Sequence, residues 1–284
     1  MAPLTLNSPQ GRITQLGGIV RSLRRLDFEI PADVEAELEI AQTQDTAARS
    51  ATAALQIARD NLHSVPASEF DSALEEFDRA SIRAFATKNG DAGFISGVTA
   101  ARLESAVHRH YGEWMERIVK EYNSVVESKD LNNHGRNLPD LTNEHLRVLD
   151  LSDTQTAAIS AWKTAVPELS KYWNVYARLA ELNGHERIRP QPVDASGANM
   201  WFACILGEAN WAQAQDAAVV MASIAGGTKA SVDIRALTPH IIPSIVGYDL
   251  NLTTPEKAKS RRMRIQPGGP TAGFTPVQHA MSSY

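Results

Sequence analysis

Two residues on one predicted helix have types and spacing that could bind a metal ion. Glu104 and His108 lie four positions apart, with His110 and Glu113 close by. A carboxylate and an imidazole one helical turn apart can share a metal ion, provided that partner helices supply further carboxylates. We interpret the group as a polar helix face and keep a helical metal-dependent enzyme as an alternative. The candidate partner carboxylates are Glu75, Glu76 and Asp78.

Other reactive side chains lack the partners that catalysis requires. Cys204 is the only cysteine, so no internal disulfide can form, and its apolar surroundings are typical of a small buried hydrophobe. Glu144–His145 and His185–Glu186 lie at predicted helix ends with no evident nucleophile. The sequence contains no phosphate-binding loop, GxSxG, HExxH or EF-hand motif. We therefore predict no catalytic residue, no metal site and no cofactor, and we expect a protein that is not an enzyme.

A basic cluster lies in the C-terminal segment 253–284, which is rich in turn-forming residues and poor in large apolar ones. Such a segment cannot bury enough surface to fold alone. We interpret it as an arm that binds neighbouring subunits. The alternative is a solvated tail that only aids solubility. Nucleic-acid binding is a further alternative, although the aromatic residues typical of single-strand binders are missing. The predicted partner-binding residues are Lys257, Lys259, Arg261, Arg262 and Arg264.

Charge is unevenly distributed along the 284 residues, whose formal net charge is -5. Residues 32–128 contain 17 acidic and 9 basic residues, whereas residues 253–284 contain 1 and 5. Residues 1–31 are also basic, with 4 basic and 2 acidic residues. Basic termini around an acidic body favour arms that dock on acidic surfaces of other subunits.

The middle of the chain predicts a mainly α fold. Residues 32–63, 67–87 and 95–126 carry apolar residues at helical spacing, so we expect a bundle of long helices over 32–128. Trp114 lies on the apolar face of the third helix and is expected to anchor a core or an interface.

Residues 129–227 predict a second helical unit. A polar loop at 129–142 precedes it, and Ser152 with Gln155 matches a capping box at a helix start. That helix is expected to end near 165, and a new one to begin at Pro167. The other expected features are a helix at 143–149, a helix at 200–225, and the anchors Trp201 and Trp211.

The two ends of the chain are expected to be extended. Residues 1–31 are interrupted by Gly17 and Gly18 and predict an arm with a short strand or helix near 19–26. Residues 228–252 are β-branched with interspersed prolines and predict short strands or extended chain.

These observations together predict a structural subunit of a large homo- or hetero-oligomer. The N-terminus lacks the pattern of a signal peptide, and the most apolar stretch, 200–225, contains charged residues. We therefore expect synthesis in the cytoplasm and no membrane partner. Extended termini that contact neighbours are common in protein shells, so a virus or phage particle is the natural setting by analogy, and copies of the chain or other subunits are the expected partners.

Overall fold

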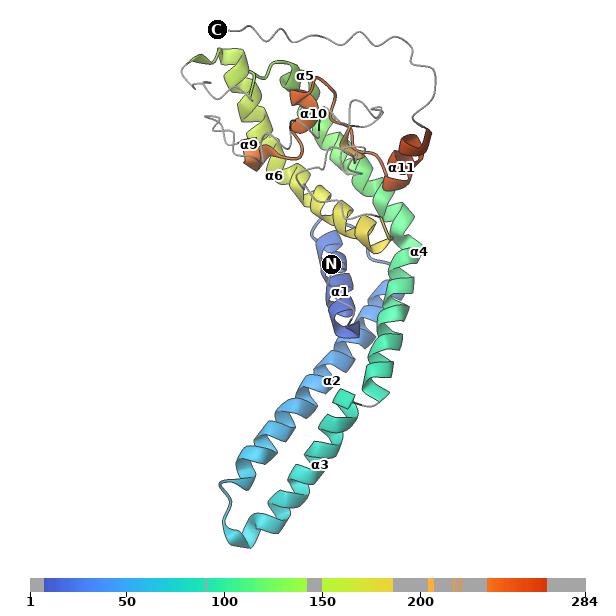
Figure 1. Ribbon diagram of the computed structural model, residues 1–284, viewed down its shortest axis with the longest axis vertical. Helices are drawn as coiled ribbons and strands as arrows, with labels where there is room; N and C mark the ends of the chain where they lie inside the picture. Colours follow the sequence, from blue (N-terminus) through green and yellow to red (C-terminus); the bar gives the residue numbers. More distant parts are fainter. Residues whose placement is uncertain are drawn as a thin grey trace. The chain divides into compact units, whose positions relative to one another are not determined.

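The computed structural model describes residues 8–89, 91–141, 150–185, 204–206, 217, 220 and 234–264. Within these residues the regular structure is helical (Figure 1), and strand-like pairing is limited to one isolated parallel bridge between Leu206 and Asn251. In the same part of the chain, no helix has the length and apolarity needed to cross a bilayer. The expected helix at 143–149 lies outside the described residues, as do Trp201, Trp211 and most of the expected helix 200–225.

The chain divides into two compact units that are not consecutive in sequence. The first unit comprises residues 1–118 and 171–184, and the second comprises 119–170 and 185–284. The long helices α4 (Asp91–Ser128) and α6 (Asp153–Leu182) each contribute to both units. This division differs from the consecutive segments expected from composition, because a long helix can carry two separate apolar faces along its length.

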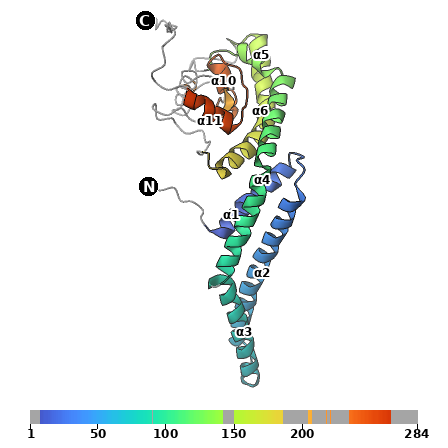
Figure 2. The same cartoon turned by 90° about the vertical axis from the view of Figure 1, so that its right-hand side faces the viewer.

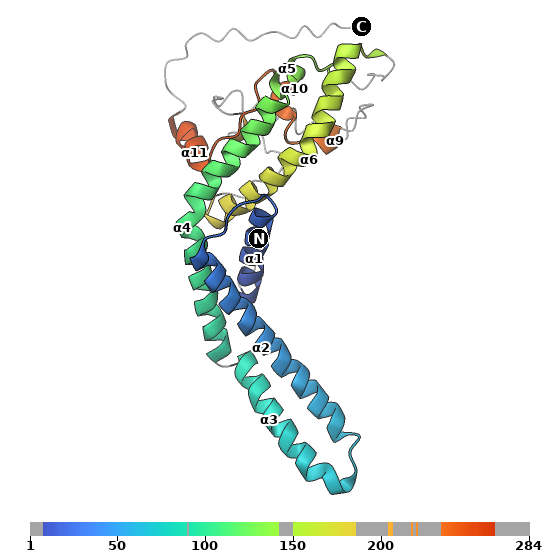
Figure 3. The ribbon, with the colours of Figure 1, turned by 180° about the vertical axis from the view of Figure 1, so that it is seen from behind.

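Helix α1 (Pro9–Arg24) occupies most of the segment that was expected to be an extended arm. The Ser8 side chain caps it by accepting a hydrogen bond from the backbone N–H of Gly11, and Pro9 starts the first turn. Gly17 and Gly18 in the interior of the helix cost roughly 1 kcal/mol each. Burial of four aliphatic side chains, at about 1.5–3 kcal/mol each, offsets this cost. Figure 3 shows α1 beside α2 and α4. The buried side chains are Leu16, Ile19, Val20 and Leu23.

Two of the predicted long helices form an antiparallel hairpin in the first unit (Figure 1). Helix α2 (Ala32–Leu62) begins after Pro31, with Asp33 and Glu35 in its first turn, where the helix dipole favours carboxylates. A tight turn and the 3₁₀ helix η1 (Ala67–Glu69) lead into α3 (Phe70–Asn89). The helix predictions for 32–63 and 67–87 are confirmed.

Helix α4 confirms the third predicted helix and begins a few residues earlier than expected. Its apolar face is buried along most of its length. Trp114, whose side chain is 3% exposed, lies in the core of the first unit beside the ring of His110.

Helix α6 is a single helix, although two helices separated at Pro167 were predicted. The predicted capping box is confirmed: Ser152 N–H donates to Gln155 Oε1 at 3.0 Å, and Gln155 N–H donates to Ser152 Oγ at 3.2 Å. Pro167 is exposed and removes one helical hydrogen bond. Burial on both sides of it, including the large ring of Trp162, stabilises the helix against that loss.

In the second unit, the segment predicted as a polar loop contains helix α5 (Leu131–Arg136). Asp130 has a positive φ of 49° and turns the chain from α4 into α5. Gly135 of α5 packs against Ser244 of α10 (Ile242–Ile245), so closely that a Cβ at Gly135 would lie 2.3 Å from Ser244 Oγ. Figure 2 shows α5 and α10 together.

The segment expected to form short strands contains two short helices, α9 (Ile234–Leu237) and α10. The β-branched residues Ile241 and Ile242 are buried in helical turns rather than in strands. Among the described residues of this region, 248–254 are extended. The expected basic arm begins with helix α11 (Pro255–Arg264), and its residues from 265 onward lie outside the described part.

Candidate interaction surface

The α2–α3 hairpin is held together mainly by small side chains. The buried apolar residues of α3 are Ala73, Ala80 and Ala84, and Ala58 is buried on the facing part of α2. Alanines seven and four positions apart lie on one helix face, and their size allows the two axes to approach closely. We call these four residues the alanine seam.

The large apolar side chains of α3 lie outside the alanine seam. Phe70, Leu74 and Phe77 follow the i, i+4, i+7 spacing of one helix face, and Phe85 continues it two turns further on. Ile82 and Phe85 are 71% and 65% exposed, respectively. The apolar face that the sequence predicted for this helix is present, but most of it faces solvent. We call Phe70, Leu74, Phe77, Ile82 and Phe85 the α3 stripe.

Exposed large apolar side chains also occur on α2 and at the start of α4. Scattered single residues of this kind are normal on any protein surface, but a concentration of them marks an interaction site. In the part of the chain that the structure describes, the most exposed large hydrophobic residues all belong to the first unit. They are Ile40, Ile57, Phe70, Leu74, Ile82, Phe85, Phe94, Ile95 and Val98.

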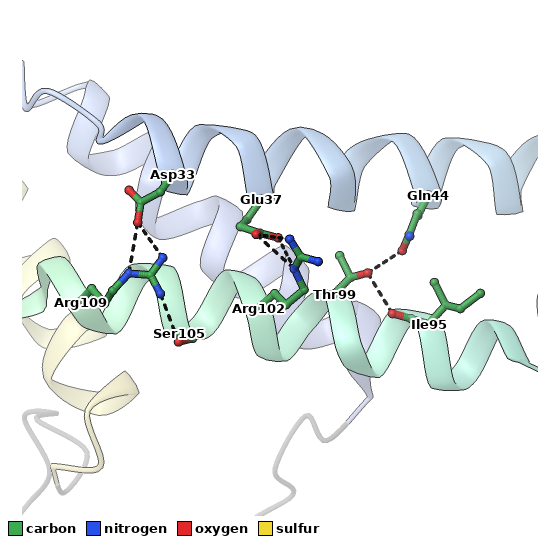
Figure 4. A network of polar contacts seen from close by, with 8 residues as sticks. All are labelled: Asp33, Glu37, Gln44, Ile95, Thr99, Arg102, Ser105 and Arg109. Atoms are coloured by element: carbon green, nitrogen blue, oxygen red, sulfur yellow. Dashed lines mark hydrogen bonds and ion pairs between the residues drawn. The ribbon is translucent and has the colours of Figure 1, made fainter.

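A row of polar contacts fixes the register of α2 against α4 (Figure 4). Arg102 makes a two-pronged contact with the carboxylate of Glu37, with N–O distances of 2.7 and 2.9 Å. Toward the hairpin turn, Thr99 Oγ1 donates to Gln44 Oε1 at 2.7 Å. The carboxylate of Glu37 raises the pKa of Arg102, so this guanidinium stays charged at all ordinary pH values.

Asp33, at the start of α2, is the last residue in this row of contacts. Its carboxylate accepts from Arg109 at 2.7 Å and lies 3.0 Å from Nε2 of His110. The hydrogen bond from Arg109, with a smaller contribution from His110, lowers the pKa of Asp33. Because Asp33 and Arg109 are both exposed, their ion pair positions the two helices more than it stabilises them.

Glu104, one of the candidate metal ligands, forms an ion pair in the structure. Arg12 of α1 donates to Glu104, and His108 Nε2 lies 3.6 Å from the same carboxylate oxygen. The three candidate partner carboxylates of α3 are exposed to solvent. Among the described residues, no group of three or more His, Cys, Asp or Glu side chains is arranged to hold a metal ion. The Arg12–Glu104 ion pair supports the interpretation as a polar helix face, which stays a prediction.

The second unit contains a buried polar cluster that the sequence analysis missed. The hydroxyl of Tyr122 lies 2.7 Å from Nδ1 of His240, and Ser170 Oγ lies 3.1 Å from Nε2. Burial lowers the pKa of His240 to about 3 and raises that of Tyr122, so both groups are neutral at physiological pH. A neutral imidazole has one donor and one acceptor nitrogen, which the two hydroxyls satisfy.

This cluster has the residue types of a nucleophile and its base, but its histidine is buried and its pKa is lowered. A histidine with so low a pKa is a weak base, and catalytic bases work best with pKa values near the operating pH. Its hydrogen bonds join α4 and α6 to the turn before α10.

Two asparagines hold the extended segment of the second unit. Asn123 of α4 pairs with Leu252, donating to its C=O at 2.9 Å and accepting from its N–H at 2.8 Å. Asn132 of α5 pairs with Leu250 in the same two-way manner. The alternate residue Asn251 instead donates its N–H to the carbonyl of Ile205 at 3.0 Å. The segment is therefore bound along both edges, as a strand in a sheet would be.

The remaining predicted residues lie in the second unit. Cys204 is buried, as expected for a small hydrophobe, and its carbonyl accepts from the N–H of Thr253 at 2.9 Å. Lys257 and Lys259 are exposed on α11 and flank the buried Ala258. Arg261, Arg262 and Arg264 belong to the same helix, and their side chains lie outside the described part of the structure.

Searches against protein-family models, curated proteins and solved structures give no match to this chain. The functional argument accordingly rests on the geometry alone. The chain is a mainly α-helical protein with a concentrated apolar surface on its first unit.

Proposed function

We propose that this chain is a structural subunit of a large homo- or hetero-oligomeric assembly and has no catalytic role. The proposal rests on one observation: the large exposed hydrophobic side chains gather on the α2–α3 hairpin and the adjoining start of α4. By analogy with other shells and connectors, a virus or phage particle is the setting that we propose.

The distribution of small and large residues on α3 supports this function. A hairpin that served only its own chain would turn its large apolar side chains inward, since each one buried contributes about 1.5–3 kcal/mol. Here alanines fill the inward positions, and phenylalanine, leucine and isoleucine occupy outward ones. Burial against another subunit recovers the stabilisation that the isolated chain forgoes.

The charge distribution supports a contribution from the C-terminal arm. The arm carries 5 basic and 1 acidic residues over 253–284, and the long-helix region 32–128 is its acidic counterpart with 17 acidic and 9 basic residues. Attraction between these surfaces on neighbouring subunits would speed association and select the correct contact. The arm begins with α11, whose start is anchored by the buried Pro255 and Ala258.

Light scattering and sedimentation of the full-length protein test the proposal. We expect a discrete oligomer, and we expect the variant Phe94→Ser/Ile95→Ser/Val98→Ser to shift it toward smaller species while its helical circular dichroism is unchanged. A matched control replaces the exposed Ala54 of α2 by Ser. A full-length protein that stays a compact monomer, both alone and with co-purified proteins from its source, would contradict the proposal.

Nucleic-acid binding by α11 is a second candidate function, favoured by the exposure of Lys257 and Lys259. Deleting the whole arm from 253 would also remove buried residues, so neutralisation is the cleaner test. Replacing the five cations by Gln should abolish binding to a labelled oligonucleotide and remove its salt dependence. Unchanged binding would exclude α11 as the site.

A further inference from the structure

Helix α3 carries opposite charges on its two halves. The exposed carboxylates Asp71, Glu75, Glu76 and Asp78 all lie in the first half. The cations of the second half are Arg83 and Lys88, and Arg79 lies at the midpoint of the helix, next to Asp78. The α3 stripe runs along both halves, so any helix that covers it comes close to both charge clusters.

We propose that the α3 stripe is the contact between two copies of this chain, whose α3 helices lie antiparallel across a two-fold axis. The inference deepens the proposed function and rests on it, because it names the partner at one surface of the assembly. In the antiparallel arrangement each acidic half faces a basic half. A parallel arrangement would instead place the carboxylates of the two copies against each other.

The apolar residues fit the same arrangement. A two-fold axis near the middle of α3 sets Leu74 of one copy opposite Phe85 of the other, and Phe77 opposite Ile82. Each of these pairs then occurs twice, as an isologous contact requires. The two hairpins together contribute four antiparallel helices, which is the architecture of a four-helix bundle.

A matched pair of exposed isoleucines distinguishes this contact from non-specific hydrophobic association. Ile82 on the α3 stripe is 71% exposed, and Ile57 on α2 is 69% exposed. Both belong to the same hairpin and lose the same surface when replaced by Ser. If α3 pairs with α3, Ile82→Ser and Phe85→Ser should each weaken self-association of the full chain at least tenfold, whereas Ile57→Ser should leave it nearly unchanged.

Thiol cross-linking tests the orientation. Leu74→Cys and Phe85→Cys are prepared separately in the full chain, whose own Cys204 is buried. A short dithiol-reactive linker should join the two variants when they are mixed, and should join neither variant to itself. Positions 74 and 85 are about 16 Å apart along one helix, so a self-linked Leu74→Cys would indicate parallel pairing and overturn the proposal.

The remaining outcomes are equally decisive. An oligomer that persists in both serine variants of α3, without cross-linking of the mixture, would overturn this contact and leave the proposed assembly role intact. A monomeric full chain would overturn the contact, while assembly with a different subunit would still be tested by co-purification. If residues 265–284 of the same chain cover the α3 stripe, Phe85→Ser should leave the mass of the protein unchanged. That result would also overturn the proposed contact.

Discussion

The hydroxyl of Tyr122 lies 2.7 Å from Nδ1 of His240, and both side chains are buried in the second unit. Because Ser170 contacts the other ring nitrogen, the imidazole is enclosed by two hydroxyls that serve its neutral form. Protonation would add a second N–H and a positive charge in a site with no carboxylate among these partners. The stability of this unit should therefore depend on pH.

The first prediction concerns that pH dependence. The pKa of His240 is lowered from 6.5 to about 3 in the fold, so the unfolded chain binds the proton more readily. Above pH 6.5 the neutral His240 costs the fold nothing. As pH falls from 6.5 toward 3, the free energy of unfolding decreases by up to about 1.4 kcal/mol per pH unit. Urea unfolding at a series of pH values measures it.

The matched variant for this prediction is His240→Gln, which retains a donor and an acceptor but does not titrate. It should lower stability at pH 7 and give a shallower loss between pH 6.5 and pH 4 than the wild-type protein. Carboxylates contribute equally to both proteins, so only the difference between the two profiles belongs to His240. Parallel profiles would show that His240 does not carry the pH dependence.

The second prediction concerns the asparagines that bind the extended segment. Asn123→Ala removes the side chain that pairs with both the backbone N–H and the C=O of Leu252, a residue that is 1% exposed. We expect a loss of about 1–3 kcal/mol, since a buried N–H and C=O are left unpaired. Hydrogen exchange of the Leu252 amide should accelerate, and Asn123→Asp, which keeps the acceptor, should protect that amide partly. A Leu252 amide that exchanges as slowly in the alanine variant would contradict the predicted pairing.

How much of this structure could be predicted depended on the range of the interactions. The long helices and the Ser152–Gln155 cap follow from spacing within one segment, and these predictions are confirmed. The continuous course of α6 through Pro167 could not be predicted, because it depends on burial on both sides of the proline.

The candidate surface shows the same limit. The apolar stripe of α3 was visible in the sequence, but its exposure was not, because the sequence does not show that alanines would form the contact with α2. The partners of His240 lie 70 and 118 positions away along the chain, and no local pattern connects them. Asn123 within a helix was the one available signal, since asparagine is a poor residue for a helix interior.

The third prediction concerns two glycines with different surroundings. Gly135→Ala would place a methyl group against Ser244, so we expect destabilisation of about 1–3 kcal/mol. Gly112 lies within α4 with open space around its Cα, and Gly112→Ala should stabilise the protein by about 0.5–1 kcal/mol. Thermal unfolding of the two variants should shift in opposite directions. The double variant Gly135→Ala/Ser244→Gly should recover part of the loss, and its failure to do so would show that the close approach is not the cause.

The last prediction concerns the alanine seam, which determines which surface α3 offers to other subunits. Ala73 is buried between α2 and α3, whereas Ala86 of the same helix is exposed. Ala73→Leu should cost about 1–3 kcal/mol by forcing the helices apart, and Ala86→Leu should change stability by less than about 0.5 kcal/mol. Because the seam also orients the α3 stripe, Ala73→Leu should weaken self-association as well as folding. Normal association in a measurably destabilised Ala73→Leu protein would show that the stripe binds its partner independently of the packing between α2 and α3.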